Sequence, residues 1–182
     1  MPDHPLRKTV RLRGHDYASP GAYSITVCTH ARACNLGTVD EDRVVLSPEG
    51  EIVRAVWQDL PCHFPGIEID ALVVMPNHLH AILILQRSVG AKHPAFPDAS
   101  PLPRPPGPRG TQTGSIPALV QNAKSISSRR INLLRGTPGA SVWQRGYYKH
   151  IIRSPGELDR LRTYIETNPL RWALDCGNPA SM

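Results

Sequence analysis

The segment 72–85 constrains the fold of this chain more than any other stretch. Two apolar runs flank a Met75-Pro76-Asn77 corner, and the second run opens with His78, Leu79 and His80. Apolar runs on both sides of a turn signal predict two short buried strands, or one strand with a break. Because strand side chains alternate between faces, both imidazoles should lie on one face and Leu79 in the core. Two neutral imidazoles on one rigid face form half of a metal site.

The length of 182 residues suits a single domain with one core. Lys and Arg number 21 against 15 Asp and Glu, and the resulting net charge of +6 favours a polyanionic partner. The four cysteines form no Cys-x-x-Cys pair, and the sequence has neither a signal peptide nor a run of roughly 20 apolar residues. We therefore expect a cytoplasmic, nucleoid-associated protein with reduced thiols and no membrane partner.

The remaining pattern predicts strands and helices around this central segment. Strands are expected at 22–29, 67–74 and 142–153, a small edge hairpin at 35–39 and 43–46, and helices at 47–61, 116–134 and 154–168. The segment from about 88 to 115 is rich in Pro, Gly, Ser and Ala, and it cannot bury enough apolar surface to offset its ordering entropy. We expect a single domain over 1–182 with this segment as a flexible insertion, although a proline-rich ligand for a partner module is also possible.

Basic side chains gather in an N-terminal arm, residues 1–20. Four of the seven positions 7–13 are basic and none is acidic. Such a run is often a solvated arm, and it is also a way in which proteins grip phosphates. The predicted helix 116–134 and the end of the strand 142–153 offer a second set of cations. The candidate contacts to a polyanionic partner such as a nucleic acid are Arg7, Lys8, Arg11, Arg13, Lys124, Arg129, Arg130 and Arg153.

Tyr164 and Asn168 lie four residues apart near the end of the last predicted helix, so they share one helical face. Taken alone, each has an ordinary explanation, the tyrosine as a half-buried aromatic and the amide as a helix stop before a proline. Phosphodiester transfer needs metal ligands and an in-line nucleophile. His78, His80 and the Asn168 amide oxygen could provide three ligands, and Tyr164 the nucleophile. A bound metal would also ease ionisation of the phenol, whose pKa in model peptides is about 10.

Tyr147 and Tyr148 are competing candidates for the nucleophile. They are neighbours on a predicted strand, so they should face opposite sides, and only one of them could approach the histidines.

Four motifs in this order resemble the repetitive-extragenic-palindrome-associated tyrosine transposases, which belong to the HUH superfamily of single-strand DNA transposases. The motifs are residues 23–29 (Tyr-Ser-Ile-Thr-Val-Cys-Thr), 74–80 (Val-Met-Pro-Asn-His-Leu-His), 142–153 (Val-Trp-Gln-Arg-Gly-Tyr-Tyr-Lys-His-Ile-Ile-Arg) and 164–169 (Tyr-Ile-Glu-Thr-Asn-Pro). The resemblance extends over nearly the whole chain, and the Pro-rich segment departs from the compact family pattern.

The resemblance implies an α+β, ferredoxin-like fold with an antiparallel sheet and helices packed on one face. It implies a divalent metal ion, Mg²⁺ or Mn²⁺, held by His78, His80 and Asn168, and Tyr164 as the nucleophile that forms a 5′-phosphotyrosine intermediate. The expected partner is single-stranded or hairpin DNA, with a monomer and a homodimer both open.

Two functional hypotheses follow from these observations. The first is a metal-dependent tyrosine transposase that cleaves and rejoins single-stranded DNA at palindromic hairpin repeats. The alternative is a domesticated nucleic-acid-binding protein of the same fold without turnover. A histidine-triad nucleotide hydrolase would need a further histidine where Ala81 and Ile82 stand.

Overall fold

Four strands form an antiparallel sheet in the order β4-β5-β1-β6. They are β1 (Gly21–Cys28), β4 (Ile67–Met75), β5 (His78–Leu85) and β6 (Tyr148–Ile152). This computed structural model describes residues 18–86 and 114–174. Most of the N-terminal arm and nearly all of the Pro-rich segment therefore lie outside the described residues. The order, with the first and third strands of the sheet in its middle, is that of the expected ferredoxin-like fold.

The central segment forms two strands rather than one broken strand. β4 and β5 pair as a hairpin in which Met75 lies opposite His78, so Pro76 and Asn77 are the two turn residues. Backbone groups outside the hairpin hold this turn, because Leu36 N–H donates to the Pro76 carbonyl at 3.0 Å and Thr29 N–H donates to the Asn77 carbonyl at 2.9 Å.

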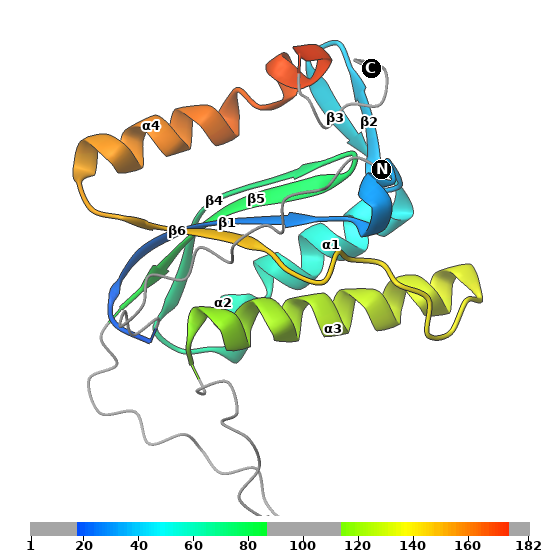
Figure 1. The fold of residues 1–182 in the computed structure, drawn as a ribbon, viewed down its shortest axis with the longest axis horizontal. Coiled ribbons are helices and arrows are strands. Elements are labelled where there is room, and N and C mark those ends of the chain that lie inside the picture. The colour runs from blue at the N-terminus through cyan, green and yellow to red at the C-terminus, as the bar shows by residue number, and fades with distance from the viewer. Residues whose placement is uncertain (1–17, 87–113, 175–182) are drawn as a thin grey trace, which may run out of the picture.

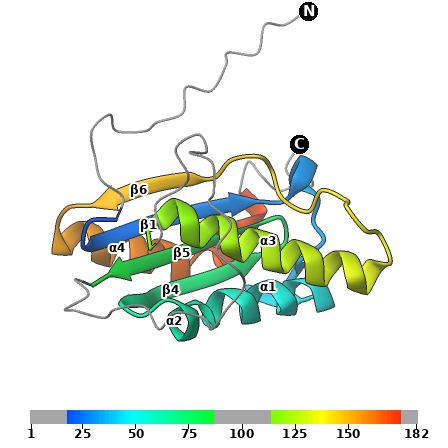
Figure 2. The ribbon, with the colours of Figure 1, turned by 90° about the horizontal axis from the view of Figure 1, so that it is seen from below.

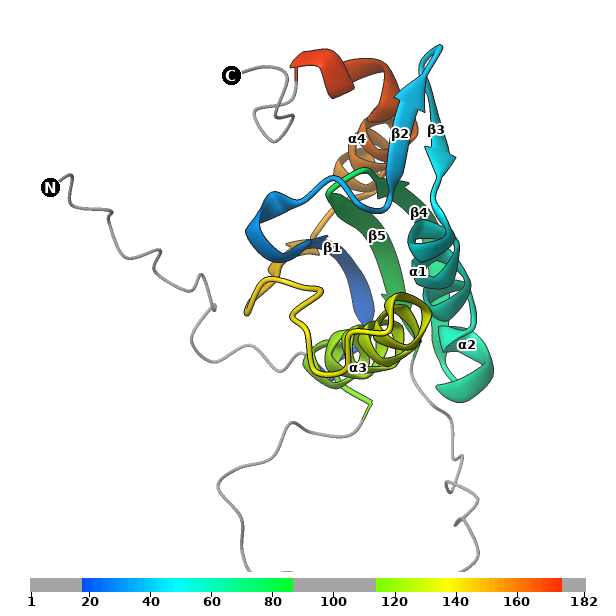
Figure 3. The same ribbon diagram turned by 90° about the vertical axis from the view of Figure 1, so that its right-hand side faces the viewer.

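Helices cover both faces of the sheet. The face that we call the core face is covered by α1 (Pro48–Gln58), α2 (Leu60–His63) and α3 (Ile116–Arg135), and these three helices lie on one side as expected (Figures 1 and 2). The last helix, α4 (Pro155–Glu166), packs on the opposite side, which we call the α4 face (Figure 3). The expectation of helices on one face is therefore wrong for α4, because its own apolar side chains pack against Ile82 and Ile152 on the other face. None of the helices in the described ranges is long and apolar enough to cross a membrane.

Two smaller pieces complete the described fold. The predicted edge hairpin is present as β2 (Gly37–Asp40) and β3 (Arg43–Leu46), which pair with each other and not with the main sheet. A short 3₁₀ turn, η1 (His30–Arg32), precedes this hairpin, and a second, η2 (Pro169–Leu174), follows α4 and lies beside the hairpin (Figure 1).

Serine caps begin the three longer helices. The hydroxyls of Ser47, Ser115 and Ser154 each accept from the backbone N–H three residues later, at 3.1, 3.4 and 3.2 Å. The predicted helix end at Pro61 is wrong in detail. α1 ends at Gln58, and Pro61 lies in the first turn of α2, where a missing N–H leaves no helical bond unmade.

The predicted strand 142–153 is shorter than expected. Only residues 148–152 form β6, and the preceding part makes a single bridge between Trp143 and Thr29. Lys124 explains part of the difference, because its ammonium donates to the carbonyls of Gln144 and Gly146 at 2.6 and 3.1 Å. The indole N–H of Trp143 also donates to the Ser127 hydroxyl at 3.0 Å, which ties this segment to α3 as well as to the end of β1.

The two faces of the sheet bury very different amounts of apolar surface. The main cluster on the core face is the larger one and includes Tyr23, Ile25, Leu79, Leu83 and Trp57. The cluster on the α4 face has three buried members, Ile82, Ile152 and Ile165, with Leu158 and Leu161 partly buried against them. β5 therefore contributes alternate residues to both layers.

Candidate active site

The two histidines of β5 lie side by side on the α4 face. Their ring centroids are 4.7 Å apart and their planes meet at 78°. Both side chains are almost completely enclosed, since His78 is 3% and His80 is 9% exposed. Leu79, between them, is fully buried in the main core. The expectation of two imidazoles on one face and an apolar residue on the other is confirmed.

A hydrogen bond to Nδ1 orients each ring. Nδ1 of His80 lies 2.8 Å from the hydroxyl of Thr26, its direct neighbour across the β1–β5 pair. Nδ1–H of His78 donates to the Asn77 amide oxygen at 2.8 Å. Because an amide oxygen can only accept, this contact puts the proton of His78 on Nδ1. Both rings would then bind a metal through Nε2, with a polar group behind each ring to fix its orientation.

The C-terminal part of the fold brings Tyr164 and Trp172 onto these two rings. The Tyr164 ring meets His80 edge-on with centroids 5.3 Å apart, and Trp172 of η2 lies 6.1 Å from His78. Tyr164 is 39% exposed, so its phenol can be reached from solvent. The structure thus joins the predicted nucleophile to the predicted paired histidines.

Asn168 lies between these two aromatic contacts along the chain, four residues from each. Its side chain is 3% exposed, and its amide oxygen is one of four buried side-chain polar atoms in the described residues that have no hydrogen-bond partner. An unpaired buried acceptor costs on the order of 1–3 kcal/mol, so native structures rarely contain one without a reason. A cation bound to this oxygen would provide the missing partner.

The donor set suits a divalent ion. Two imidazole nitrogens and an amide oxygen are ligands that first-row divalent metals accept, and an oxygen ligand also suits Mg²⁺ or Mn²⁺. In residues 18–86 and 114–174, no group of three or more His, Cys, Asp or Glu side chains could hold a metal. A three-ligand site at these histidines therefore needs a side chain such as the Asn168 amide, and the residues present fit such an ion.

Sequence reasoning missed the groups that orient the site. Asn77 and Thr26 hold the two imidazoles, and Trp172 lies against His78. Asn77 carried a signal that could have been used, because it directly precedes His78 in the turn. Thr26 and Trp172 carried none, since their places depend on strand register and on the path of the chain after α4.

The two competing tyrosines do face opposite sides. Tyr147 packs against the main core, whereas Tyr148 is 56% exposed. Tyr148 pairs with Thr26, which in turn pairs with His80, and directly paired residues share a face. Tyr148 is therefore on the histidine face, but strand β1 separates it from His80.

The predicted DNA contacts fall into separate places. Arg7, Lys8, Arg11 and Arg13 lie outside the described residues. Lys124 is engaged with two carbonyls, and burial lowers the pKa of its ammonium, so it holds the segment before β6. Arg129 and Arg130 are exposed on α3, on the side of the sheet away from the histidines, and Arg153 is exposed between β6 and α4. The four of these cations that the structure describes are not gathered around the site.

Comparisons with known proteins find one solved structure with a similar fold and one protein with a similar sequence. No family model matches the chain. A solved structure of a REP-associated tyrosine transposase bound to a REP hairpin has a similar fold, with a TM-score of 0.56 and 20% identity over 86% of this chain and 71% of that one. An uncharacterized protein of Haemophilus influenzae is 34% identical over 173 residues, which span 93% of this chain and 91% of that protein. The chain therefore belongs to the same family as this Haemophilus influenzae protein.

Proposed function

We propose that this chain is an HUH-type tyrosine transposase that cleaves and rejoins single-stranded DNA at palindromic hairpin repeats with a divalent metal ion, Mg²⁺ or Mn²⁺. The observation that carries the proposal is the meeting of Tyr164 with His80, at 5.3 Å between ring centroids. The unpaired buried oxygen of Asn168, four residues after Tyr164 along the chain, supports it. The similarity of the fold to that of a tyrosine transposase bound to a REP hairpin supports hairpin DNA as the substrate.

His78, His80 and Asn168 would hold the metal ion. When bound, it would polarise the phosphoryl oxygens of the scissile phosphate and favour the ionised phenol. Thr26 and Asn77 keep the two rings in place behind it. This division of labour explains why polar groups are buried on the α4 face at all, since burial of unpaired polar groups is otherwise unfavourable.

Tyr164 would act as the nucleophile. Its phenolic oxygen attacks the phosphorus, a bond from the tyrosine oxygen to phosphorus forms, and the bond from phosphorus to the 3′ oxygen breaks. The phenol proton passes to solvent, which reaches this half-exposed side chain, and the leaving oxygen takes up a proton as a 3′-hydroxyl. The 5′-phosphotyrosine that results is opened by a 3′-hydroxyl of DNA, which rejoins the strand and restores Tyr164.

A covalent adduct tests the proposal. The chain is incubated with single-stranded hairpin DNA and Mn²⁺, and protein joined to DNA is sought on a denaturing gel. We expect an adduct with the wild type, none after chelation, and none with His78→Ala or His80→Ala, while these variants keep most of their DNA binding. Affinity should survive because it comes mainly from phosphate contacts elsewhere. Hairpin binding without any adduct would favour the binding protein without turnover.

A further inference from the structure

A bulge in β4 directs one carboxylate towards α4. Ile69 lies opposite Leu83 and Ala71 lies opposite Ile82, so Asp70 is the extra residue at the register shift. Bulges of this kind re-aim a side chain. The Asp70 side chain is only 10% exposed. A carboxylate so enclosed is tolerated when it is paired and hydrogen-bonded.

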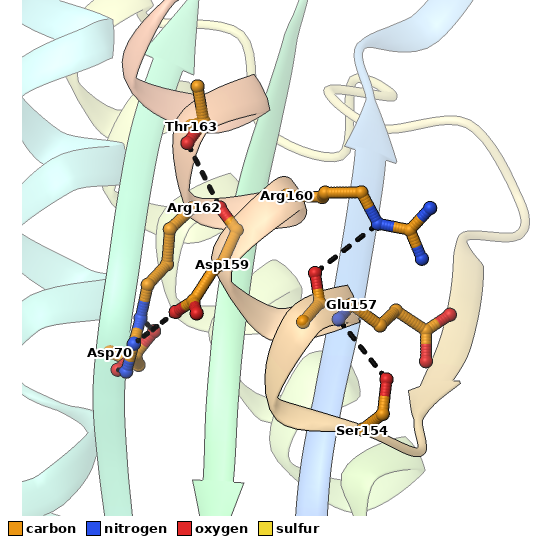
Figure 4. Close-up of polar contacts among 8 residues, drawn as sticks. Asp70, Ser154, Glu157, Asp159, Arg160, Arg162 and Thr163 are labelled. Atoms are coloured by element: carbon orange, nitrogen blue, oxygen red, sulfur yellow. Dashed lines mark hydrogen bonds and ion pairs between the residues drawn. The ribbon is translucent and has the colours of Figure 1, made fainter.

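Arg162 of α4 provides this pairing with both arms of its guanidinium. Its Nε donates to one Asp70 oxygen at 2.8 Å, and its Nη2 donates to the other at 2.5 Å (Figure 4). A fork of two parallel hydrogen bonds fixes direction as well as distance. Arg162 also contacts Asp159 at 3.1 Å, but that carboxylate is 70% exposed and lies on the same helix, so it cannot hold the helix to the sheet.

The geometry of the helix connects this ion pair to the tyrosine. Arg162 and Tyr164 are two positions apart, which places them roughly 200° apart around the helix axis. The apolar stripe of Leu158, Leu161 and Ile165 packs on the sheet between them. If α4 rotated about its own axis, Arg162 would move towards the sheet as Tyr164 moved away from it, or the reverse.

Apolar contacts alone would not prevent such a roll. Hydrophobic burial has no preferred direction, and this cluster has only three buried members in the described ranges. A second polar contact, between His150 Nε2 and Glu157 Oε1 at 2.7 Å, holds the start of α4 more than a turn away from Tyr164. The Asp70–Arg162 fork is a directional contact that lies at the level of the tyrosine.

We propose that the Asp70–Arg162 ion pair is a positioning device that sets the roll of α4 and thereby holds Tyr164 against His80. Asp70 and Arg162 act through the helix and need not touch DNA. The proposal rests on the proposed function for its catalytic consequence, but the placement of Tyr164 can be measured without any reaction.

The kinetic test uses two acids that share one arginine. Asp70→Asn removes the charge of the enclosed partner and keeps its shape, and Asp159→Asn makes the same change at the exposed partner. We expect Asp70→Asn to slow adduct formation at saturating hairpin DNA about 10- to 100-fold without weakening DNA binding, because small displacements of a reacting group cost rates of this order. We expect Asp159→Asn to change the rate by no more than about twofold, since exposed pairs contribute little.

The structural test measures the surroundings of Tyr164 directly. The protein is labelled with 3-fluorotyrosine, and the ¹⁹F resonance of Tyr164 is assigned by its absence in Tyr164→Phe. The resonance should shift in Asp70→Asn and stay in place in Asp159→Asn. Arg162→Lys, which keeps the charge and loses the fork, should shift it as well and serves if Asp70→Asn does not fold.

Adduct formation and the Tyr164 resonance together distinguish a failure of the positioning device from a failure of the proposed function. A shifted Tyr164 resonance with no adduct even in the wild type would support the positioning device while the proposed function failed. An unshifted Tyr164 resonance in folded Asp70→Asn and Arg162→Lys would overturn the positioning device, whatever happened to the adduct.

Discussion

The core face and the α4 face of the sheet share the same strands and bury different chemistry. The core face packs on α1 and α3 mainly through hydrophobic side chains that are almost all fully enclosed, with a few buried polar groups such as Ser127 of α3. The α4 face packs through three buried isoleucines, and it also carries the enclosed polar side chains of His78 and His80. The buried Asn168 follows shortly after the end of α4. β5 serves both faces, so neighbouring residues of one strand have unrelated tasks.

This difference indicates where the stability of the fold and its chemistry originate. Burying a large apolar side chain contributes roughly 1.5–3 kcal/mol, whereas a buried polar group without a partner is unfavourable. The larger apolar layer can therefore support a second layer whose polar groups are suited to binding rather than to stability. The following predictions test this division.

The largest effect should come from Leu79. This residue lies between the two histidines in the sequence, but its side chain is fully buried on the opposite, core face. Leu79→Ala should lower the free energy of unfolding by about 2–5 kcal/mol, because it removes apolar contacts and leaves a cavity. Urea denaturation measures this change. Val45→Ala, at a 56% exposed position of the edge hairpin, is the matched control and should change it little. Equal losses in the two variants would contradict the division.

Shortening a buried side chain of the α4 cluster should destabilise α4 more than the strands of the sheet. Ile165→Ala should cost about 2 kcal/mol, at the low end for such a change, because the small cluster can partly close the gap. Hydrogen exchange should show faster exchange of α4 amides with little change in β1 and β5. Glu166→Ala, at the exposed neighbouring position, is the control. Uniform loss of protection across the sheet would show that the two layers unfold as one.

A smaller change on the α4 face should lower the affinity for the metal ion and have only a small effect on stability. Thr26→Val keeps the shape of the side chain and removes the hydroxyl beside His80 Nδ1. We expect Mn²⁺ affinity to fall about 10-fold, as for other groups that orient a ligand, with a loss of about 1 kcal/mol in stability. Titration calorimetry and urea denaturation measure the two quantities. Thr38→Val on the exposed edge hairpin should alter neither, and an unchanged affinity in Thr26→Val would remove the orienting role.

The smallest effect should be the pH dependence of α4 docking through Glu157. The backbone N–H of Arg153 and the His150 ring hold the pKa of this carboxyl below its ordinary value of 4.5. A lowered folded-state pKa gives a stabilisation that is present above the unfolded-state value and is lost as the pH falls through the folded-state value. Glu157→Gln should therefore flatten the acid limb of stability below about pH 4.5, and Glu166→Gln should leave it as in the wild type.

Local chemistry made much of this fold predictable. Ser47 and Ser154 mark the starts of two helices, and the alternation of His78, Leu79 and His80 predicts the faces on which they lie. These features depend on neighbours along the chain, which is why the sequence contains them.

Features that depend on distant partners could not be predicted. Thr26 meets His80 because of the register between β1 and β5, and the two residues are 54 positions apart. The bulge that directs Asp70 towards Arg162 leaves no mark in the local sequence. The strand predicted from residue 142 begins at Tyr148, because Lys124 of a distant helix takes two of the carbonyls that precede it.

The measurement that tests the central claim most directly is the site at which DNA becomes attached. Hairpin DNA is incubated with the wild-type chain and Mn²⁺, the trapped adduct is digested, and the modified peptide is identified by mass spectrometry. Tyr164 meets His80 on the α4 face, whereas Tyr148 lies on the same face beyond β1 and is more exposed. Our account predicts DNA on Tyr164 and no adduct with Tyr164→Phe. DNA attached to Tyr147 or Tyr148, or an undiminished adduct with Tyr164→Phe, would contradict it.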